Sequence, residues 1–297
     1  MVVPDVRPRL IPKPLKPKFR YPKPRQRLTT VMAVDCADGV VLCADGQETN
    51  EYVGFGTKQL VSKIDQLRFG NESSRHCLLG CAGLTTYTNQ LRERVEQAVL
   101  TRNGTYFEAL EIATRNYSKF VNARKPDTGL LFDQSWASAI FAGYDPQDKK
   151  HYIYSIWPPH PPELLSKYPH RTGTGTGWVF ASLLFVVAEQ LMSKLEITWK
   201  NLSTLVAAQF CYMALGRIMN YDRESGLGTN IYRIGTDGIF EGMSDETISP
   251  GHSTETFRLP IILRTLMKEK QISKDKLFSL MEEYGLTSVI AEAFSEK

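Results

Sequence analysis

The sequence predicts an α+β fold in which helices cover two sheets from the outside. The chain has 297 residues, of which 42% are hydrophobic and 23% are charged, so it can bury a large core. Strand-like runs occur in groups separated by pairs of helix-like stretches, whereas a parallel βαβ fold alternates single strands with single helices. The longest apolar run, 178–188, is shorter than the ~20 residues that cross a bilayer, so no membrane association is expected.

Residues 1–28 differ in composition from the rest of the chain. They contain seven of the 16 prolines, and nine basic residues against a single acidic one. Proline at this density is incompatible with a helix or a central strand and favours an extended chain. We interpret the segment as a leader outside the fold. It would be a disordered solubilising tail, a pro-segment that is removed, or a basic arm for an acidic partner surface or nucleic acid.

The predicted domain begins at Thr29. Residues 30–34 and 40–44 are apolar, small or β-branched, and the Asp38-Gly39 pair between them is a strong hairpin signal. Both runs are almost continuously apolar, as expected for strands that are covered on both faces.

The remaining elements follow in groups of the same type. Helices are expected at 86–101, 107–122, 178–194 and 202–220, and strands at 77–83, 137–144, 151–156, 230–234 and 238–241. The tail should hold two short helices, one of them capped by Ser273 and stopped by Gly285. The chain is thus divided into a leader at 1–28, one domain at 29–249 and a helical extension at 250–297.

Metal, phosphate and thiol chemistry are not expected. The five cysteines lie in or beside apolar stretches, and their odd number favours buried thiols in a reducing, cytoplasmic compartment. His76, Cys77 and Cys81 match no common zinc-site spacing, so no metal is predicted. The glycines of 173–177 open a helix, but no lysine follows at phosphate-binding spacing, so no cofactor is predicted.

Thr29 stands between the leader and the first strand, and this position suggests its chemistry. Cleavage before Thr29 would free an α-amine, with a pKa of about 8, beside the threonine hydroxyl. Because such an amine can act as a general base, an N-terminal threonine is an activated nucleophile. The reaction also needs a cation near the hydroxyl, a carboxylate beside that cation and a backbone N–H for the oxyanion. Asp45, Lys63 and Gly83 are the candidates for these roles.

Short motifs with a family signature occur in a fixed order along the chain. They are Thr-Thr-Val-Met-Ala-Val at 29–34, an Ala-Asp ending at 44–45, Val-Ser-Lys-Ile at 61–64, Gly-Cys-Ala-Gly at 80–83, Phe-Ala-Gly-Tyr-Asp at 141–145, Gly-Thr-Gly at 175–177 and Asp-Arg-Glu-Ser-Gly at 222–226. Their order and spacing over 29–245 resemble those of β-type proteasome subunits and the bacterial HslV peptidase. The resemblance implies a four-layer αββα sandwich of the N-terminal-nucleophile (Ntn) hydrolase class, and threonine-type endopeptidase activity.

The resemblance also implies a role for each matched residue. Thr29 would be the nucleophile after removal of 1–28, with its own amine as base. Lys63 would lower the pKa of the hydroxyl, Asp45 would hold Lys63, and the Gly83 N–H would bind the oxyanion. The residues implied to hydrogen-bond around the amine and hydroxyl are Asp222, Ser225 and Thr176, with Thr174 as the alternative to Thr176. The residues implied to line the specificity pocket are Glu48, Val61, Cys81 and Thr85.

The resemblance leaves two alternatives open. Leu28 stands where self-processing β-type subunits have glycine, and an unprocessed chain would be a non-catalytic structural subunit. An Ntn acyl-transferase or amidase could use the same threonine, because a fold does not fix a reaction. The partners implied are peptides or unfolded polypeptides as substrates, copies of the chain in a ring or stacked rings, and an ATPase or other regulator. Nucleic acid is not an expected partner beyond a minor role for the basic arm.

Overall fold

The computed structural model describes most of the chain from Thr29 onward. The described residues are 29–52, 55–60, 62–68, 76–83, 85–101, 104–128, 137–165, 170–218, 228–250, 259–269 and 272–283. The leader lies outside them, and so do the site candidates Val61, Asp222 and Ser225, as well as Gly285 of the tail. In 47–52 and 55–60 only the backbone is described.

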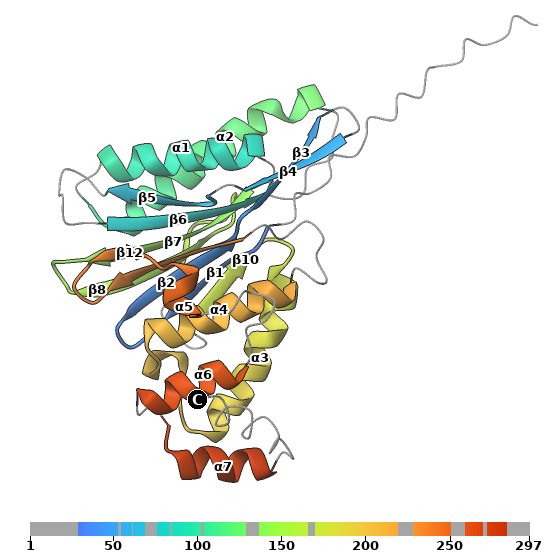
Figure 1. Cartoon of the computed structure of the whole chain (residues 1–297). Helices are drawn as coiled ribbons and strands as arrows, with labels where there is room; N and C mark the ends of the chain where they lie inside the picture. The colour runs from blue at the N-terminus through green and yellow to red at the C-terminus, as the bar shows by residue number, and fades with distance from the viewer. Residues whose placement is uncertain are drawn as a thin grey trace, which may run out of the picture.

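Two five-stranded antiparallel sheets lie at the centre of the molecule (Figure 1). In spatial order, the first sheet comprises β10 (Arg171–Thr174), β1 (Val31–Asp35), β2 (Gly39–Asp45), β11 (Thr229–Gly235) and β12 (Phe240–Gly242). The second comprises β5 (Ile64–Arg68), β6 (His76–Gly83), β7 (Ala137–Asp145), β8 (Lys150–Ile156) and β9 (Glu163–Leu164). A separate hairpin is formed by β3 (Gln47–Tyr52) and β4 (Phe55–Leu60).

Helices cover both outer faces of this pair of sheets (Figure 1). The second sheet is covered by α1 (Thr85–Thr101) and α2 (Tyr106–Thr128), and the first by α3 (Trp178–Lys194) and α4 (Thr204–Ile218). The shorter helical elements are η1 (Trp199–Asn201), α5 (Asp245–Ile248), α6 (Leu259–Lys268) and α7 (Lys274–Glu283). The predicted α+β fold with its αββα layers is confirmed.

The strand sequences explain the layering. On β1, Val31 and Ala33 contact the second sheet, whereas Met32 and Val34 pack in the cluster formed with α3 and α4. Since successive side chains of a strand point to opposite faces, a strand buried on both faces must be apolar throughout. The Asp38 carboxylate then joins the hairpin to a helix, because it accepts a hydrogen bond of 2.6 Å from the Thr204 N–H at the start of α4.

Strands with polar sequences were the ones that the sequence did not predict. The hairpin of β3 and β4, strand β5 and the short strand β10 lack the apolar runs that identify the central strands. The edge strand β10 overlaps the glycine-rich stretch 173–177, which was expected to open a helix. Its pairing with β1, Val31 opposite Thr174, brings residues 174–177 beside the start of the domain.

The tail packs against the first-sheet side of the sandwich. Residues of α6 and α7, among them Ile262, Leu266 and Leu277, join the cluster that includes α4. The Ser273 hydroxyl accepts a hydrogen bond of 3.2 Å from the Lys276 N–H, so the predicted cap of α7 is confirmed.

Candidate active site

Buried charge gathers at the end of the sandwich where β1 begins. Among the described residues, Asp45 and Lys63 are the only charged residues that are buried, with 1% and 8% of their surfaces exposed. Lys63 Nζ lies 2.7 Å from Asp45 Oδ2. A buried ion pair is costly to desolvate, so its presence points to a functional constraint at this position.

The register of β1 and β2 places Asp45 beside the first residues of the domain. Val31 is paired with Ala44, so Thr30 lies opposite Asp45. The Thr30 N–H donates to Asp45 Oδ1 at 2.7 Å, and the Asp45 N–H donates to the Thr30 carbonyl oxygen at 3.2 Å. One carboxylate oxygen of Asp45 therefore accepts a hydrogen bond from the backbone, and the other contacts Lys63.

Lys63 reaches this point from the other sheet. It directly precedes β5, and its carbonyl oxygen accepts a hydrogen bond of 3.3 Å from the Cys81 N–H on β6. Its ammonium then donates to Thr29 Oγ1 at 3.1 Å. Thr29 itself is 5% exposed. The structure thus brings together three of the predicted catalytic residues, Thr29, Asp45 and Lys63.

The segment after β10 closes tightly over Thr29 and Thr30. Gly175 has a φ of +90°, and a Cβ there would lie 1.7 Å from the Thr29 carbonyl oxygen. A Cβ on Gly177 would lie 1.8 Å from the Thr30 hydroxyl oxygen. Position 175 therefore requires glycine, because a side chain there would displace the backbone of Thr29, and a side chain at position 177 would displace the Thr30 hydroxyl.

The geometry distinguishes Thr174 from Thr176. The Thr174 hydroxyl is fully buried and hydrogen-bonded to the Ser138 hydroxyl on β7. The Thr176 hydroxyl is buried too, but it has no hydrogen-bond partner among the described residues. Thr176 lies between two glycines that contact Thr29 and Thr30, so of the two threonines it is the one near the site whose hydroxyl has no partner among the described residues.

The glycine turn at the end of β6 lies on the same side of the molecule. The position of a Cβ on Gly175 is 3.4 Å from the Ala82 Cβ, so β6 ends next to the segment that closes over Thr29. The following residue, Gly83, has a φ of +128°. The oxyanion role of its N–H stays a prediction.

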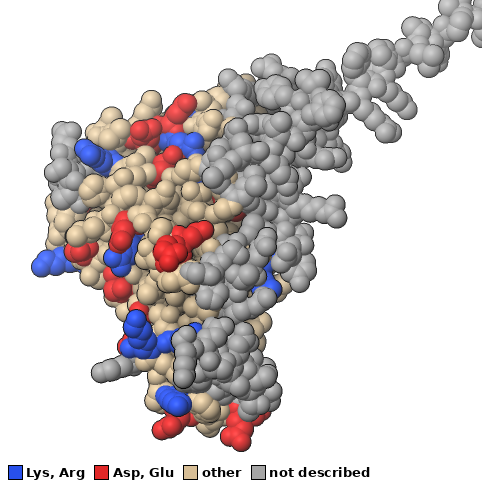
Figure 2. Space-filling model, viewed as in Figure 1, with Lys and Arg blue, Asp and Glu red and all other residues tan. Residues whose placement is uncertain are grey.

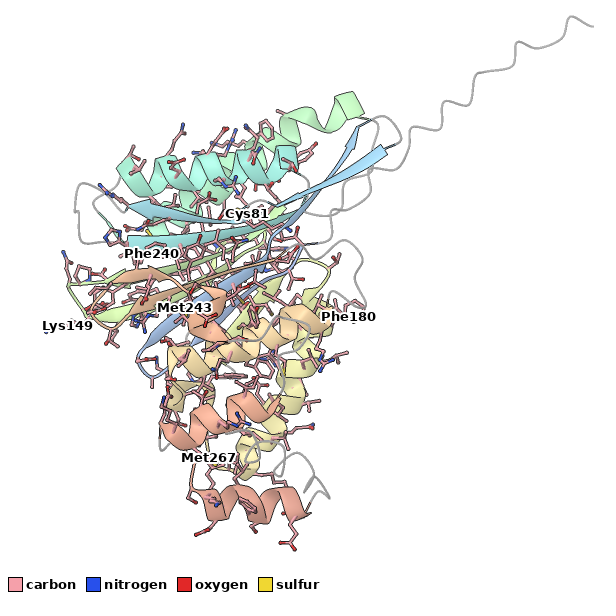
Figure 3. The ribbon with its side chains drawn as sticks, in the orientation of Figure 1. Cys81, Lys149, Phe180, Phe240, Met243 and Met267 are labelled. Carbon is pink, nitrogen blue, oxygen red and sulfur yellow. The ribbon has the colours of Figure 1, made fainter. Side chains whose placement is uncertain are left out.

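The four predicted pocket residues are described to different extents. Cys81 packs on the α1 side of the second sheet (Figure 3). Thr85 begins α1 and is half-buried. Burial raises the pKa of the Cys81 thiol to about 12, so the thiol is neutral at physiological pH. The Glu48 side chain and all of Val61 lie outside the described residues.

Some polar residues near the site were not predicted from the sequence. Ser138, the partner of Thr174, is the one polar side chain in the run 137–143, a signal that could have identified it. Asp65 on β5 forms an ion pair with Arg92 on α1, and both groups act electrostatically on the Cys81 thiol. Burial raises the pKa of Asp65, while the guanidinium of Arg92 opposes this shift. No local pattern could have paired residues 27 positions apart.

Four further features of the described residues concern surface charge, metal-binding groups, membrane-spanning helices and the exposure of cysteines. Figure 2 shows acidic and basic side chains interspersed on the face in view. In the part of the chain that the structure describes, no group of three or more His, Cys, Asp or Glu side chains is placed to hold a metal ion. None of the described helices combines the length and the apolar character needed to cross a membrane. All five cysteines are buried.

The sandwich, with a threonine at the start of its first strand, is a proteasome-like fold of the Ntn-hydrolase kind. Residues 27–159 match the family model described as Proteasome subunit. A search of the curated proteins finds no match.

Solved structures of Anbu proteins share the fold. The Anbu (Gly-1) mutant from Hyphomicrobium sp. strain MC1 is 15% identical, with a TM-score of 0.56 over 82% of this chain and 95% of that one. Anbu (ancestral beta-subunit) from Yersinia bercovieri is 12% identical, with a TM-score of 0.56 over 88% and 96% of the two chains. The helical assembly of the Anbu complex from Pseudomonas aeruginosa is 13% identical, with a TM-score of 0.56 over 72% and 85%. At these identities the likeness concerns the fold.

Proposed function

We propose that this protein is a threonine-type endopeptidase of the proteasome kind, with the hydroxyl of Thr29 as its nucleophile. The observation that carries the proposal is the hydrogen bond of 3.1 Å from Lys63 Nζ to Thr29 Oγ1. A cation at this distance stabilises the alkoxide form of the hydroxyl and so lowers its pKa. Asp45 holds Lys63 in place beside Thr29 through its contact of 2.7 Å.

Activity requires the removal of residues 1–28. While Leu28 is attached, the nitrogen of Thr29 is an amide and cannot accept a proton. Hydrolysis of the bond between Leu28 and Thr29 would create an α-amine with a pKa of about 8, which is a suitable base at neutral pH. In this proposal the leader is a pro-segment that suppresses the peptidase until it is removed.

The chemical steps then follow from the placed groups. The amine accepts the hydroxyl proton, directly or through a water, while Oγ1 bonds to the carbonyl carbon of the substrate. The Gly83 N–H stabilises the resulting oxyanion. The protonated amine gives its proton to the leaving nitrogen as the peptide bond breaks, which leaves the acyl group on Thr29 as an ester. Water, activated by the same amine, hydrolyses this ester and restores the threonine.

The freed amine needs hydrogen-bond partners of its own. Thr176 offers a buried hydroxyl that has no partner among the described residues, so we assign it, in preference to Thr174, to a hydrogen bond with the amine. Asp222 and Ser225 complete this set in the proposal. Glu48, Val61, Cys81 and Thr85 would contact the substrate side chain next to the cleaved bond, and the substrates would be peptides or unfolded polypeptides.

We further propose that copies of the chain assemble through the outer face of α3. Five large apolar side chains on this helix are exposed: Val179, Phe180, Leu183, Val186 and Val187. Phe180 lies at the periphery of the molecule in Figure 3. No charged residue occurs between 178 and 188, so two copies can meet here without bringing like charges together. The helical assembly of the similar Anbu complex supports an assembled state for this chain.

A charge placed on α3 tests the assembly. Leu183→Glu should shift the purified protein to a smaller species in size-exclusion chromatography with light scattering. Ile239→Glu is the matched control, because Ile239 is 62% exposed and Leu183 is 63% exposed. An unchanged mass for Leu183→Glu, or an equal shift for both variants, would contradict assembly through α3.

Substitution of the nucleophile tests the catalytic proposal. Thr29→Ala should abolish hydrolysis of fluorogenic peptides and covalent labelling by an epoxyketone, while the assembly stays intact. Activity that survives this substitution would overturn the assignment of Thr29.

A non-catalytic structural subunit is the second candidate function, and Leu28 is the observation that favours it. Self-removal of the leader is the step that this residue puts in question. The candidate predicts an assembled protein that retains its leader and does not react with the epoxyketone.

The five buried cysteines are consistent with the reducing cytoplasm that we propose as the location in either case.

A further inference from the structure

Two pairs of hydroxyl groups cross between the sheets at β10. Ser138 Oγ on β7 is hydrogen-bonded to Thr174 Oγ1, and Ser155 Oγ on β8 lies 2.7 Å from Thr172 Oγ1. Thr172 and Thr174 are two residues apart, so their side chains leave the same face of the strand. Next to these pairs, the contacts between the sheets are apolar. Val31, which is paired with Thr174 within the first sheet, is an example.

These hydroxyl pairs constrain β10 more strictly than apolar contacts would. Since β10 is an edge strand, it is paired on one side only, with β1. Apolar packing tolerates sliding, whereas a buried hydrogen bond has a narrow range of distance and angle. The bond between Ser138 and Thr174 therefore fixes the end of β10, and the bond between Ser155 and Thr172 fixes its middle.

The end of β10 is in direct contact with the candidate nucleophile. Gly175 follows Thr174 at once, and its backbone is so close to the Thr29 carbonyl oxygen that a Cβ would lie 1.7 Å from it. A shift of Thr174 would thus be transmitted through Gly175 to Thr29. The hydrogen bond of 3.1 Å between Thr29 and Lys63 depends on that position.

We propose that Ser138 is a positioning residue for Thr29, an inference that rests on the proposed peptidase function. The Ser138 hydroxyl fixes the position of Thr174 by a hydrogen bond, and thereby fixes Gly175, the next residue. Gly175 in turn contacts the backbone of Thr29 and keeps Thr29 within reach of Lys63. Ser138 does not touch the reacting atoms. Its loss should therefore lower kcat and leave KM nearly unchanged, because substrate contacts elsewhere are kept.

Ser138→Ala and Ser155→Ala form a matched pair of variants. Each removes one hydroxyl of similar burial from one inter-sheet pair, but only the pair with Ser138 adjoins Gly175. We expect Ser138→Ala to lower kcat and the rate of epoxyketone labelling of Thr29 roughly tenfold or more, as expected for a nucleophile displaced by a fraction of an ångström. Ser155→Ala should change both less than about twofold.

A double variant separates positioning from stability. Ser138→Ala leaves the Thr174 hydroxyl buried without its partner, which lowers the melting temperature. Adding Thr174→Val removes the unpaired hydroxyl and should restore much of the melting temperature, but not kcat, since the directional bond stays absent. A conservative Thr174→Ser variant keeps the bond and should keep kcat. Recovery of kcat together with the melting temperature in the double variant would overturn the proposal.

Hydrogen–deuterium exchange tests the same inference without any activity. Ser138→Ala should raise the exchange rate of amides in 29–34 and 171–177 about tenfold, and Ser155→Ala should leave 29–34 unchanged. If the wild-type protein cleaves no peptide, the proposed function fails while this comparison still decides on Ser138. Equal exchange in 29–34 for both variants and the wild type would show that Ser138 does not position Thr29.

Discussion

The space between the two sheets is apolar in its middle and polar at the end where β1 begins. The apolar part is formed by Val31, Ala33, Leu42, Leu78 and Ile140. The polar part is formed by Thr29, Asp45, Lys63, Ser138 and Thr174. Both parts are buried to a similar degree, so solvent access does not explain the difference. Apolar residues are expected to stabilise such a space at least as well as an ion pair, so the polar end is where we propose that the chemistry takes place.

The largest expected effect on activity comes from replacing a charged residue of the polar end by an apolar one. Lys63→Met should reduce peptide hydrolysis at least 10²–10³-fold, the scale for loss of one preorganised electrostatic group. It should also destabilise the fold by about 3–5 kcal/mol, because the buried carboxylate of Asp45 loses the cation that lies 2.7 Å from it. Peptidase assays and chemical denaturation measure the two losses.

Adding Asp45→Asn to Lys63→Met separates those losses. The double variant has no buried charge at this place, and the side-chain carbonyl of the introduced asparagine can still accept the Thr30 N–H. Most of the lost stability should return, and the activity should not. An active double variant would contradict the role of Lys63.

A substitution in the apolar middle should lower stability but leave the activity of the folded protein almost unchanged. Leu42→Ala removes a fully buried side chain from the space between the sheets and should cost about 2–5 kcal/mol of stability. The activity of each folded molecule should stay within about twofold of wild type, since Leu42 contacts no reacting group. Thermal denaturation, combined with titration of active sites by an epoxyketone, checks both values. A large fall in activity for each titrated site would show that the two parts are coupled.

Gly175 lies at the border between the two parts and should show an intermediate effect. Gly175→Ala places a Cβ on the Thr29 carbonyl oxygen in a backbone conformation with φ of +90°. We expect roughly a hundredfold loss of activity and a stability loss of about 1–3 kcal/mol. Gly104→Ala serves as the control, because its Cβ would meet only the movable end of the Glu108 side chain.

Much of this arrangement followed from the sequence because its signals are local. The apolar runs and the Asp38-Gly39 turn predicted β1 and β2, and the ordered motifs predicted that Lys63 and Asp45 would meet at Thr29. Strand β10 was not predicted, because a polar edge strand carries no apolar pattern. Its contact with Ser138 was not predicted either, since it joins two sheets across 36 residues. Thr174 and Thr176 are alike in sequence, and only their partners tell them apart.

The smallest effect is expected at Cys81, which lies near the polar end but faces α1. Burial raises the pKa of its thiol to about 12, so the thiol is protonated below that pH and becomes a reactive thiolate only above it. N-ethylmaleimide at pH 7–8 should therefore leave peptidase activity unchanged within about 20%, because it reacts with the thiolate. Rapid inactivation that Cys81→Ala prevents would contradict this description of the site.

The intact mass and N-terminal sequence of the purified, assembled protein test the central claim most directly. If Thr29 is the nucleophile and its amine the base, the chain in the active assembly must begin at Thr29, without residues 1–28. An active assembly whose chains all retain Leu28 would leave Thr29 without a free amine, and would contradict the proposed mechanism.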